Sequence, residues 1–90
     1  MNTRTIFESE GWYFPDAWDR TGLFGIVGGE KGFTFLGVKQ ISVPLSFQNL
    51  RIIEEDSVEF AQQGLKRYLL FTGSEYQYCH EIIASSCSIS

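Results

Sequence analysis

The chain has 90 residues, 43% of them hydrophobic and 20% charged, and carries a formal net charge of −4 at pH 7. This length leaves room for a single hydrophobic core, so we expect one domain over residues 1–90, and the apolar content excludes a disordered or collagen-like chain. Seven scattered Lys and Arg residues against eleven Asp and Glu argue against a nucleic-acid partner, and the short apolar runs argue against a membrane partner.

The N-terminal segment combines strand and turn signals. Residues 3–8 are predicted to form a first strand, and Gly11 then precedes an aromatic run at residues 12–14. Proline fits the first position of a helix, so Pro15–Arg20 is predicted to form a single helical turn. This turn is expected to end the aromatic run.

A β-hairpin is the clearest local pattern. The β-prone runs Leu23–Val27 and Phe33–Val38 flank residues 28–32, where three of the five residues are glycine. Glycine reaches the positive φ angles that tight or bulged hairpin turns require. The two runs are therefore predicted to pair as antiparallel strands.

Apolar and polar residues then alternate over residues 41–47, which predicts another strand. Pro44 cannot donate a backbone hydrogen bond, so this strand is expected at a sheet edge or broken at the proline. The extended pattern resumes at Leu50–Ile53, after a turn or bulge at Gln48–Asn49.

Asp56 and Glu59 have the spacing of a capping box, which predicts a short helix near residues 56–63. This helix can end at Gly64, a residue suited to the position after the last turn, or continue to about Thr72. We favour the end at Gly64, because the aromatic and β-branched residues that follow fit a strand better than a helix.

A second hairpin is predicted from Tyr68–Thr72 and Tyr76–Ile83, joined by a turn around Gly73. The serine-rich residues 85–90 are expected to be a flexible tail or an edge strand. Together the elements predict an α+β fold. We expect five to seven short, mostly antiparallel strands in a curled sheet or half-open barrel, with one short helix.

Reactive side chains are few. Cys79 and His80 are neighbours in a predicted strand and point to opposite faces, so they cannot form a nucleophilic pair. With Cys87 they offer three soft ligands, but without the close ligand pairs of structural zinc sites. We expect no catalytic residue, no metal site and no cofactor. The first residues lack the apolar core of a secretory signal, so we expect a cytoplasmic protein with reduced thiols.

Aromatic residues account for 16% of the chain, fourteen in all. A core of this size encloses only part of so many rings, so we expect several to line a functional surface. The candidates for a binding surface are Trp12, Tyr13, Trp18, Tyr68, Tyr76 and Tyr78.

These observations favour a small, non-enzymatic binding or assembly protein. Both faces of the predicted second hairpin are substantially apolar, so we expect a homodimer or larger oligomer that buries an aromatic sheet face. One alternative is a compact acidic inhibitor or immunity-type protein that docks on a larger, basic protein partner. Another is a small-ligand binder whose Trp/Tyr pocket holds a cationic molecule by cation–π attraction.

Overall fold

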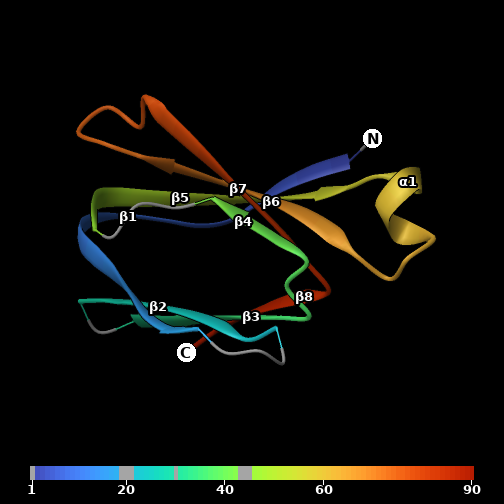
Figure 1. The fold of residues 1–90 in the computed structure, drawn as a ribbon. Coiled ribbons are helices and arrows are strands. Elements are labelled where there is room, and N and C mark those ends of the chain that lie inside the picture. Colours follow the sequence, from blue (N-terminus) through green and yellow to red (C-terminus); the bar gives the residue numbers. More distant parts are fainter. Residues whose placement is uncertain (1, 19–21, 30, 43–45) are drawn as a thin grey trace.

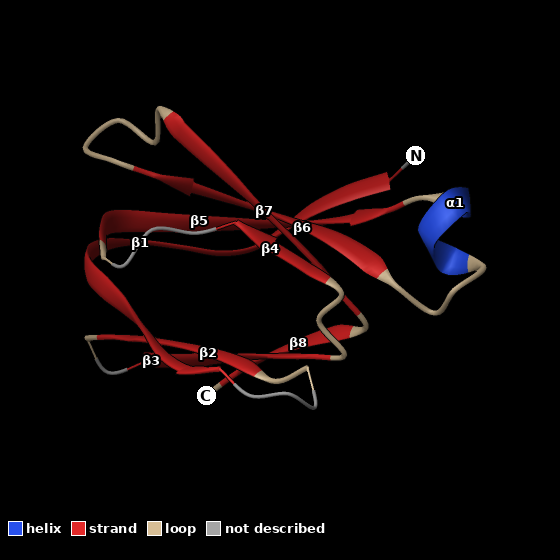
Figure 2. Cartoon of the chain, in the orientation of Figure 1, coloured by secondary structure: helices blue, strands red, loops and turns tan. Residues whose placement is uncertain are grey.

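The computed structural model describes residues 2–18, 22–29, 31–42 and 46–90, which form mostly β structure (Figures 1 and 2). The elements in chain order are β1 (Asn2–Trp18), β2 (Phe24–Gly28), β3 (Lys31–Leu36), β4 (Gln40–Ser42), β5 (Phe47–Asp56), α1 (Val58–Ala61), β6 (Lys66–Thr72), β7 (Tyr78–Ala84) and β8 (Ser86–Ile89). The strands make one antiparallel sheet in the order β4-β7-β6-β5-β1-β2-β3-β8. The sheet is not closed, because its outermost strands, β4 and β8, do not pair with each other.

Figure 1 shows the sheet folded into two layers. The upper layer contains β4, β7, β6, β5 and the first part of β1, and the lower layer contains β2, β3, β8 and the end of β1. Strand β1 pairs with β5 from Asn2 to Tyr13 and with β2 from Phe14 to Trp18. One strand therefore belongs to both layers and joins them.

Two irregularities bend β1 between the layers. Its register against β5 shifts between Ser9 and Trp12, around Gly11, whose φ of +135° favours glycine. Its register against β2 shifts between Pro15 and Ala17. An extra residue at such a bulge bends the strand and increases its twist, and a bulge also tolerates a proline that cannot donate to the ladder.

The prediction for the N-terminal segment was therefore wrong in part. The strand predicted at residues 3–8 does not end there but continues through the aromatic run at residues 12–14. The predicted helical turn is extended over residues 15–18, where pairing with β2 outweighs the helix-start preference of proline. Residues 19–20 of that predicted turn lie outside the described part of the chain.

The chain crosses between the layers twice more at the opposite end of the molecule. The segment after β3 rises to β4 in the upper layer, and the segment after β7 descends to β8 in the lower layer (Figure 1). These two segments are bonded to each other, because Lys39 N–H donates to the Ile83 carbonyl and Ser85 N–H donates to the Leu36 carbonyl, each at 2.8 Å. The layers are thus held together at both ends.

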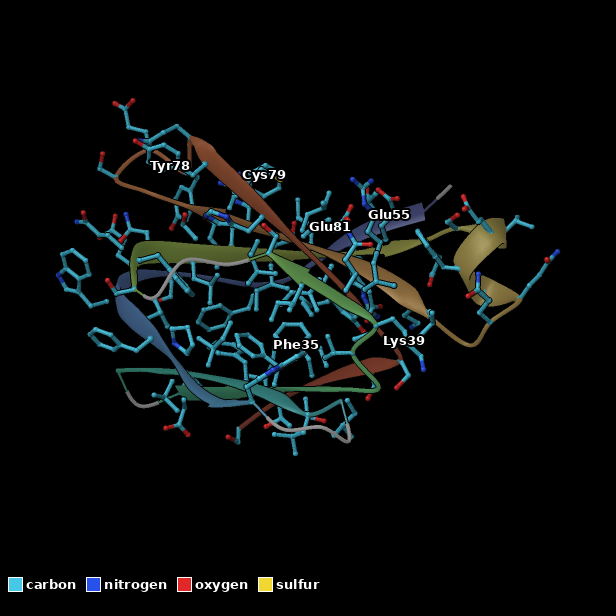
Figure 3. All side chains as sticks on the ribbon, in the orientation of Figure 1. Phe35, Lys39, Glu55, Tyr78, Cys79 and Glu81 are labelled. Carbon is cyan, nitrogen blue, oxygen red and sulfur yellow. The ribbon has the colours of Figure 1, made fainter. Side chains whose placement is uncertain are left out.

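Aromatic rings fill the space between the layers. Phe7 of β1 contacts Phe33 of β3 with ring centroids 4.6 Å apart, and Phe35 of β3 meets Tyr68 of β6 edge-on at 5.3 Å. Figure 3 shows Phe35 between the two layers. The buried members of this core are Tyr13, Phe24, Ile26, Phe33, Phe35, Val38, Phe47, Leu50, Ile52, Tyr68, Leu70, Ile82 and Ala84.

The helix is shorter than its sequence pattern predicted. It spans only four residues, and its N-cap is Ser57, which makes no side-chain capping bond. The capping box predicted from Asp56 and Glu59 is wrong because Asp56 still pairs with Asn2 at the end of β5. The chain turns at Gly64, with φ +71°, and β6 begins at Lys66, so the strand interpretation of the following residues is confirmed.

The fold class also needs correction. The described residues hold eight strands and one very short helix, so the fold is mostly β rather than α+β with five to seven strands. Both predicted hairpins are confirmed, as β2–β3 and β6–β7. The strand predicted over residues 41–47 is represented by β4 and the start of β5, and its proposed break at Pro44 lies outside the described residues. The expected tail forms β8, which pairs with β3.

Asn49 of β5 forms hydrogen bonds to both β1 and the β6–β7 turn. Its backbone has φ +61°, a conformation that asparagine tolerates better than most residues, and its side chain is 6% exposed. The Oδ1 atom accepts from Gly11 N–H at 3.0 Å, and Nδ2 donates to the Gly73 carbonyl at 3.3 Å. Gly73 N–H also donates to the Gln48 carbonyl at 2.6 Å. Asn49 therefore holds the bend of β1 and the β6–β7 turn against β5.

We expect Asn49→Asp to lower the free energy of unfolding by about 1–3 kcal/mol. Aspartate retains the size of the side chain and its tolerance of positive φ, but its carboxylate cannot donate to the Gly73 carbonyl. Urea unfolding at pH 7.5 measures the loss. Gln48→Glu is the control, because it adds the same charge at the neighbouring, exposed position. Equal losses in the two variants would contradict a role for the Asn49 bonds.

Candidate functional site

A pocket of about 470 Å³ lies beside the turn that joins β6 to β7. Strand β4 pairs with β7 only from Glu81 to Ile83, so among the described strands residues 78–80 have β6 alone as a neighbour. The pocket is lined by Trp12, Ser46, Phe47, Gln48, Thr72, Gly73, Ser74, Gln77, Tyr78 and His80.

Three aromatic residues supply most of the apolar lining. Trp12 of β1 and Tyr78 of β7 are 58% and 59% exposed, which is unusual for such large rings. Phe47 of β5 is buried and stacks on Tyr13 of the core, with ring centroids 6.1 Å apart. The pocket thus combines one ring fixed by the core with two rings that a bound molecule can cover. Figure 3 shows Tyr78 close to the tip of the β6–β7 hairpin.

A polar pair, one member of which is buried, forms another part of the lining. Thr72 Oγ1 and His80 Nε2 lie 3.1 Å apart and share a hydrogen bond, and Thr72 is only 2% exposed. Burial lowers the pKa of His80 below its usual value, so the imidazole is neutral at pH 7 and above. The pair therefore offers a polar contact without a formal charge.

Gly73 leaves room for the side chains of two lining residues, Gln77 and Tyr78. Its φ is +101°, and a Cβ atom there would lie 2.6 Å from Gln77 Oε1 and 2.9 Å from Tyr78 Cδ2. Gln77 Oε1 accepts instead from Glu75 N–H at 2.9 Å, which folds the Gln77 side chain back onto the turn. A larger residue than glycine at position 73 would displace both side chains.

The structure places two of the six predicted binding residues, Trp12 and Tyr78, in this pocket. Tyr13 and Tyr68 are buried in the core. Tyr76 lies under the guanidinium of Arg51, whose Cζ is 4.6 Å from the ring centroid. Trp18, at the far end of β1, is exposed and meets Phe24 edge-on.

Sequence reasoning missed most of the remaining lining, including Phe47, Thr72 and His80. A local signal was available for two of them. Thr72 and His80 occupy the strands of the predicted second hairpin, close to its turn, and opposed positions there share a face with Tyr78. No local signal could bring β1 and β5 to the same pocket.

A second cluster of polar side chains lies at the other end of β5 and β6, around Glu54. Its carboxylate accepts from the Tyr68 hydroxyl at 3.0 Å, from Arg4 Nη2 at 2.8 Å and from Lys66 Nζ at 3.4 Å. Burial acts to raise the pKa of Glu54, but the hydrogen bond from Tyr68 and the charges of Lys66 and Arg4 together outweigh it and lower the pKa. These charges are mutually satisfied, so the cluster has a structural role.

The two cysteines differ in their surroundings. Cys79 is exposed and pairs with Phe71, whereas the adjacent His80 pairs with Leu70 on the opposite face. Burial raises the pKa of the Cys87 thiol to about 12, so this thiol stays protonated and unreactive at neutral pH. Within the described ranges, no three His, Cys, Asp or Glu side chains gather as a metal site requires.

Comparison of the chain with family models, curated proteins and solved structures gives no match. The function is therefore argued from the residues of the pocket. Over the described part of the chain, no helix has the length and apolar character needed to cross a bilayer.

We expect the Glu54 network to stabilise the fold at neutral pH and to weaken in acid. A lowered pKa means that the stabilisation is complete above the ordinary glutamate value of 4.5 and is lost as the pH falls through the folded-state pKa. Glu54→Gln should therefore be less stable than the wild type at pH 7, and the gap should narrow below about pH 4.5. Urea unfolding from pH 7 to pH 3 measures this gap.

Glu59→Gln provides the control, because Glu59 is exposed on α1 and has no ion pair among the described residues. Its stability should follow that of the wild type over the whole range. A gap between Glu54→Gln and the wild type that stays constant from pH 7 to pH 3 would show that the Glu54 charge does not stabilise the fold.

Proposed function

We propose that this chain is a non-enzymatic binding protein that holds a small organic molecule in the pocket between Trp12 and Tyr78. The observation that carries the proposal is the presence of two largely exposed aromatic rings in one pocket of about 470 Å³. This volume lies within the range of about 300–1,000 Å³ that is typical of small-molecule sites. Mostly apolar walls with a few placed polar groups are also typical of such sites.

The polar pair in the pocket favours binding over catalysis. A hydroxyl beside an imidazole is the arrangement of a nucleophile and its base, but such a pair also needs an accessible hydroxyl and a group that orients the imidazole. Thr72 is almost fully buried, and no carboxylate among the described residues forms a hydrogen bond or ion pair with His80. The pair is therefore suited to anchoring a ligand.

We expect Trp12→Ala to weaken the binding of a neutral, environment-sensitive naphthalene dye by about tenfold, since loss of one stacking ring costs about 1.4 kcal/mol. Fluorescence titration of the dye measures the affinity. Trp18→Ala is the matched control, because Trp18 lies on the same strand with the same 58% exposure but outside the pocket. Its affinity should equal that of the wild type, and equal losses in both variants would place the dye elsewhere.

A second candidate function is self-association through the outer face of the upper layer. Ile53, Leu69 and Phe71 lie together on this face and are partly exposed. Helix α1 contacts β6 at one end of the layer and has no buried residue of its own. The dimer surface proposed here is therefore mainly aliphatic, whereas the sequence had predicted an aromatic one.

The charges around this apolar group favour a second copy as the partner. Arg51 pairs with Glu8 at 2.6 Å on one side, and Arg67 pairs with Glu55 and Glu81 on the other. A face that carries both signs beside an apolar centre can meet its own copy around a two-fold axis with opposite charges in contact.

We expect light scattering after size exclusion at tens of micromolar to give the mass of a dimer. Leu69→Lys should give a monomer, because it introduces an unpaired charge at the centre of the apolar group. Thr34→Lys, on the outer face of the lower layer, should remain a dimer. A wild-type protein that runs as a monomer would exclude self-association and leave the small-molecule function unaffected.

A further inference from the structure

The described residues that line the pocket between Trp12 and Tyr78 are uncharged, and this limits the ligands that the pocket can accept. Its described residues offer aromatic rings, hydroxyls, amides and one imidazole, which is neutral at pH 7 and above. No Asp, Glu, Lys or Arg is among them. A charged group that is covered by such surroundings loses part of its hydration and gains no charged partner.

A cationic ligand, one of the possibilities raised by the sequence, fits these surroundings poorly. Tyr76, which is not in the described lining, already has one ring face covered by Arg51, whose Cζ lies 4.6 Å from the ring centroid. Arg51 in turn is paired with Glu8 at 2.6 Å. The rings that remain, Trp12 and Tyr78, have no carboxylate beside them in the described lining to hold a cation.

The size of the pocket sets the size of the ligand. Its volume of about 470 Å³ is about three times that of the cavity of roughly 150 Å³ that holds one benzene molecule. Two or three fused or linked rings therefore fill it. Flat rings also make the best contact with the two exposed aromatic side chains.

His80 provides a polar contact for such a ligand. Its Nε2 atom bonds Thr72 Oγ1 at 3.1 Å, and its Nδ1 atom has no hydrogen-bond partner in the described part of the chain. A neutral imidazole can present this second nitrogen either as donor or as acceptor, according to its tautomer. Both a hydroxyl group and a ring nitrogen can bond to it.

We infer that the pocket takes an uncharged aromatic molecule of two or three rings that carries a hydroxyl group or a ring nitrogen bonded to His80. This inference rests on the proposed small-molecule function and names the class of ligand. The lining residues that the structure describes carry no charge and so select against ions, and the His80 Nδ1, which has no partner among the described residues, selects for a polar group on the ring.

The test compares four probes that share one ring system: naphthalene, naphthol, naphthalene sulfonate and naphthylmethylammonium. Each competes with the neutral naphthalene dye at pH 7.5. Naphthol should bind about tenfold more tightly than either ion, because the ions lose hydration without gaining a partner. It should also bind several-fold more tightly than naphthalene, because a hydrogen bond contributes about 1 kcal/mol.

The outcomes separate the two proposals. If neither the dye nor any of the four probes binds, the small-molecule function itself is wrong. If the probes bind but one of the ions binds as tightly as naphthol, the function stands and the inferred ligand class is wrong. Both results come from the wild-type protein, so they do not depend on the folding of a variant.

Two substitutions at His80 test the polar contact. His80→Phe should bring the affinity ratio of naphthol to naphthalene close to 1, because no group remains to bond the hydroxyl. His80→Gln retains a donor and an acceptor and should restore part of the preference. An unchanged ratio in His80→Phe, measured on protein with a cooperative thermal transition, would show that His80 does not contact the ligand.

Discussion

Strand β1 pairs with β5 through most of its length and with β2 at its end, and the position of every other element depends on this shared strand. The bulges around Gly11 and Pro15 let one strand follow two layers that run in different directions. Neighbouring residues of a strand point to opposite faces, so Tyr13 enters the core while Trp12 reaches the pocket. The same bend therefore builds the core and supplies one wall of the candidate site.

The sequence predicted correctly those parts of the fold that depend on residues close together in the chain. Both hairpins follow from glycine-containing turns between β-prone runs, and their partners are near neighbours in the chain. The prediction for the N-terminal segment was wrong because Gly11 and Pro15 lie at bulges within one strand, although glycine and proline ordinarily mark the end of a strand. The predicted helix was too long because Asp56 pairs with Asn2 in the sheet. A pairing between residues so far apart in the sequence leaves no local pattern.

The candidate site was predictable only in part, because it also depends on residues that are far apart in the sequence. Tyr68 and Tyr78 lie on the same face of the β6–β7 hairpin, so the alternation of the strands could not separate the core residue from the pocket residue. Tyr68 is buried in the core, where Glu54 accepts its hydroxyl, and this partner is fourteen residues away in the sequence. Tyr78 lies in a pocket to which Trp12 of β1 and Phe47 of β5 also contribute, and both come from distant parts of the chain.

The strand pairings between distant parts of the chain, β3 with β8 and β1 with β5, affect the order in which the molecule assembles. The lower layer is complete only when Ile89 has paired with Phe33, and the upper layer only when Asp56 has paired with Asn2. Contacts between such distant residues form late, because a long loop must be closed before they contribute free energy. We therefore expect the hairpins to form early and the whole protein to fold in milliseconds to seconds, the range of all-β domains of non-local topology. Until β8 docks, the aromatic rings of β3 remain open to solvent on one side, and in that interval the chain is most exposed to aggregation.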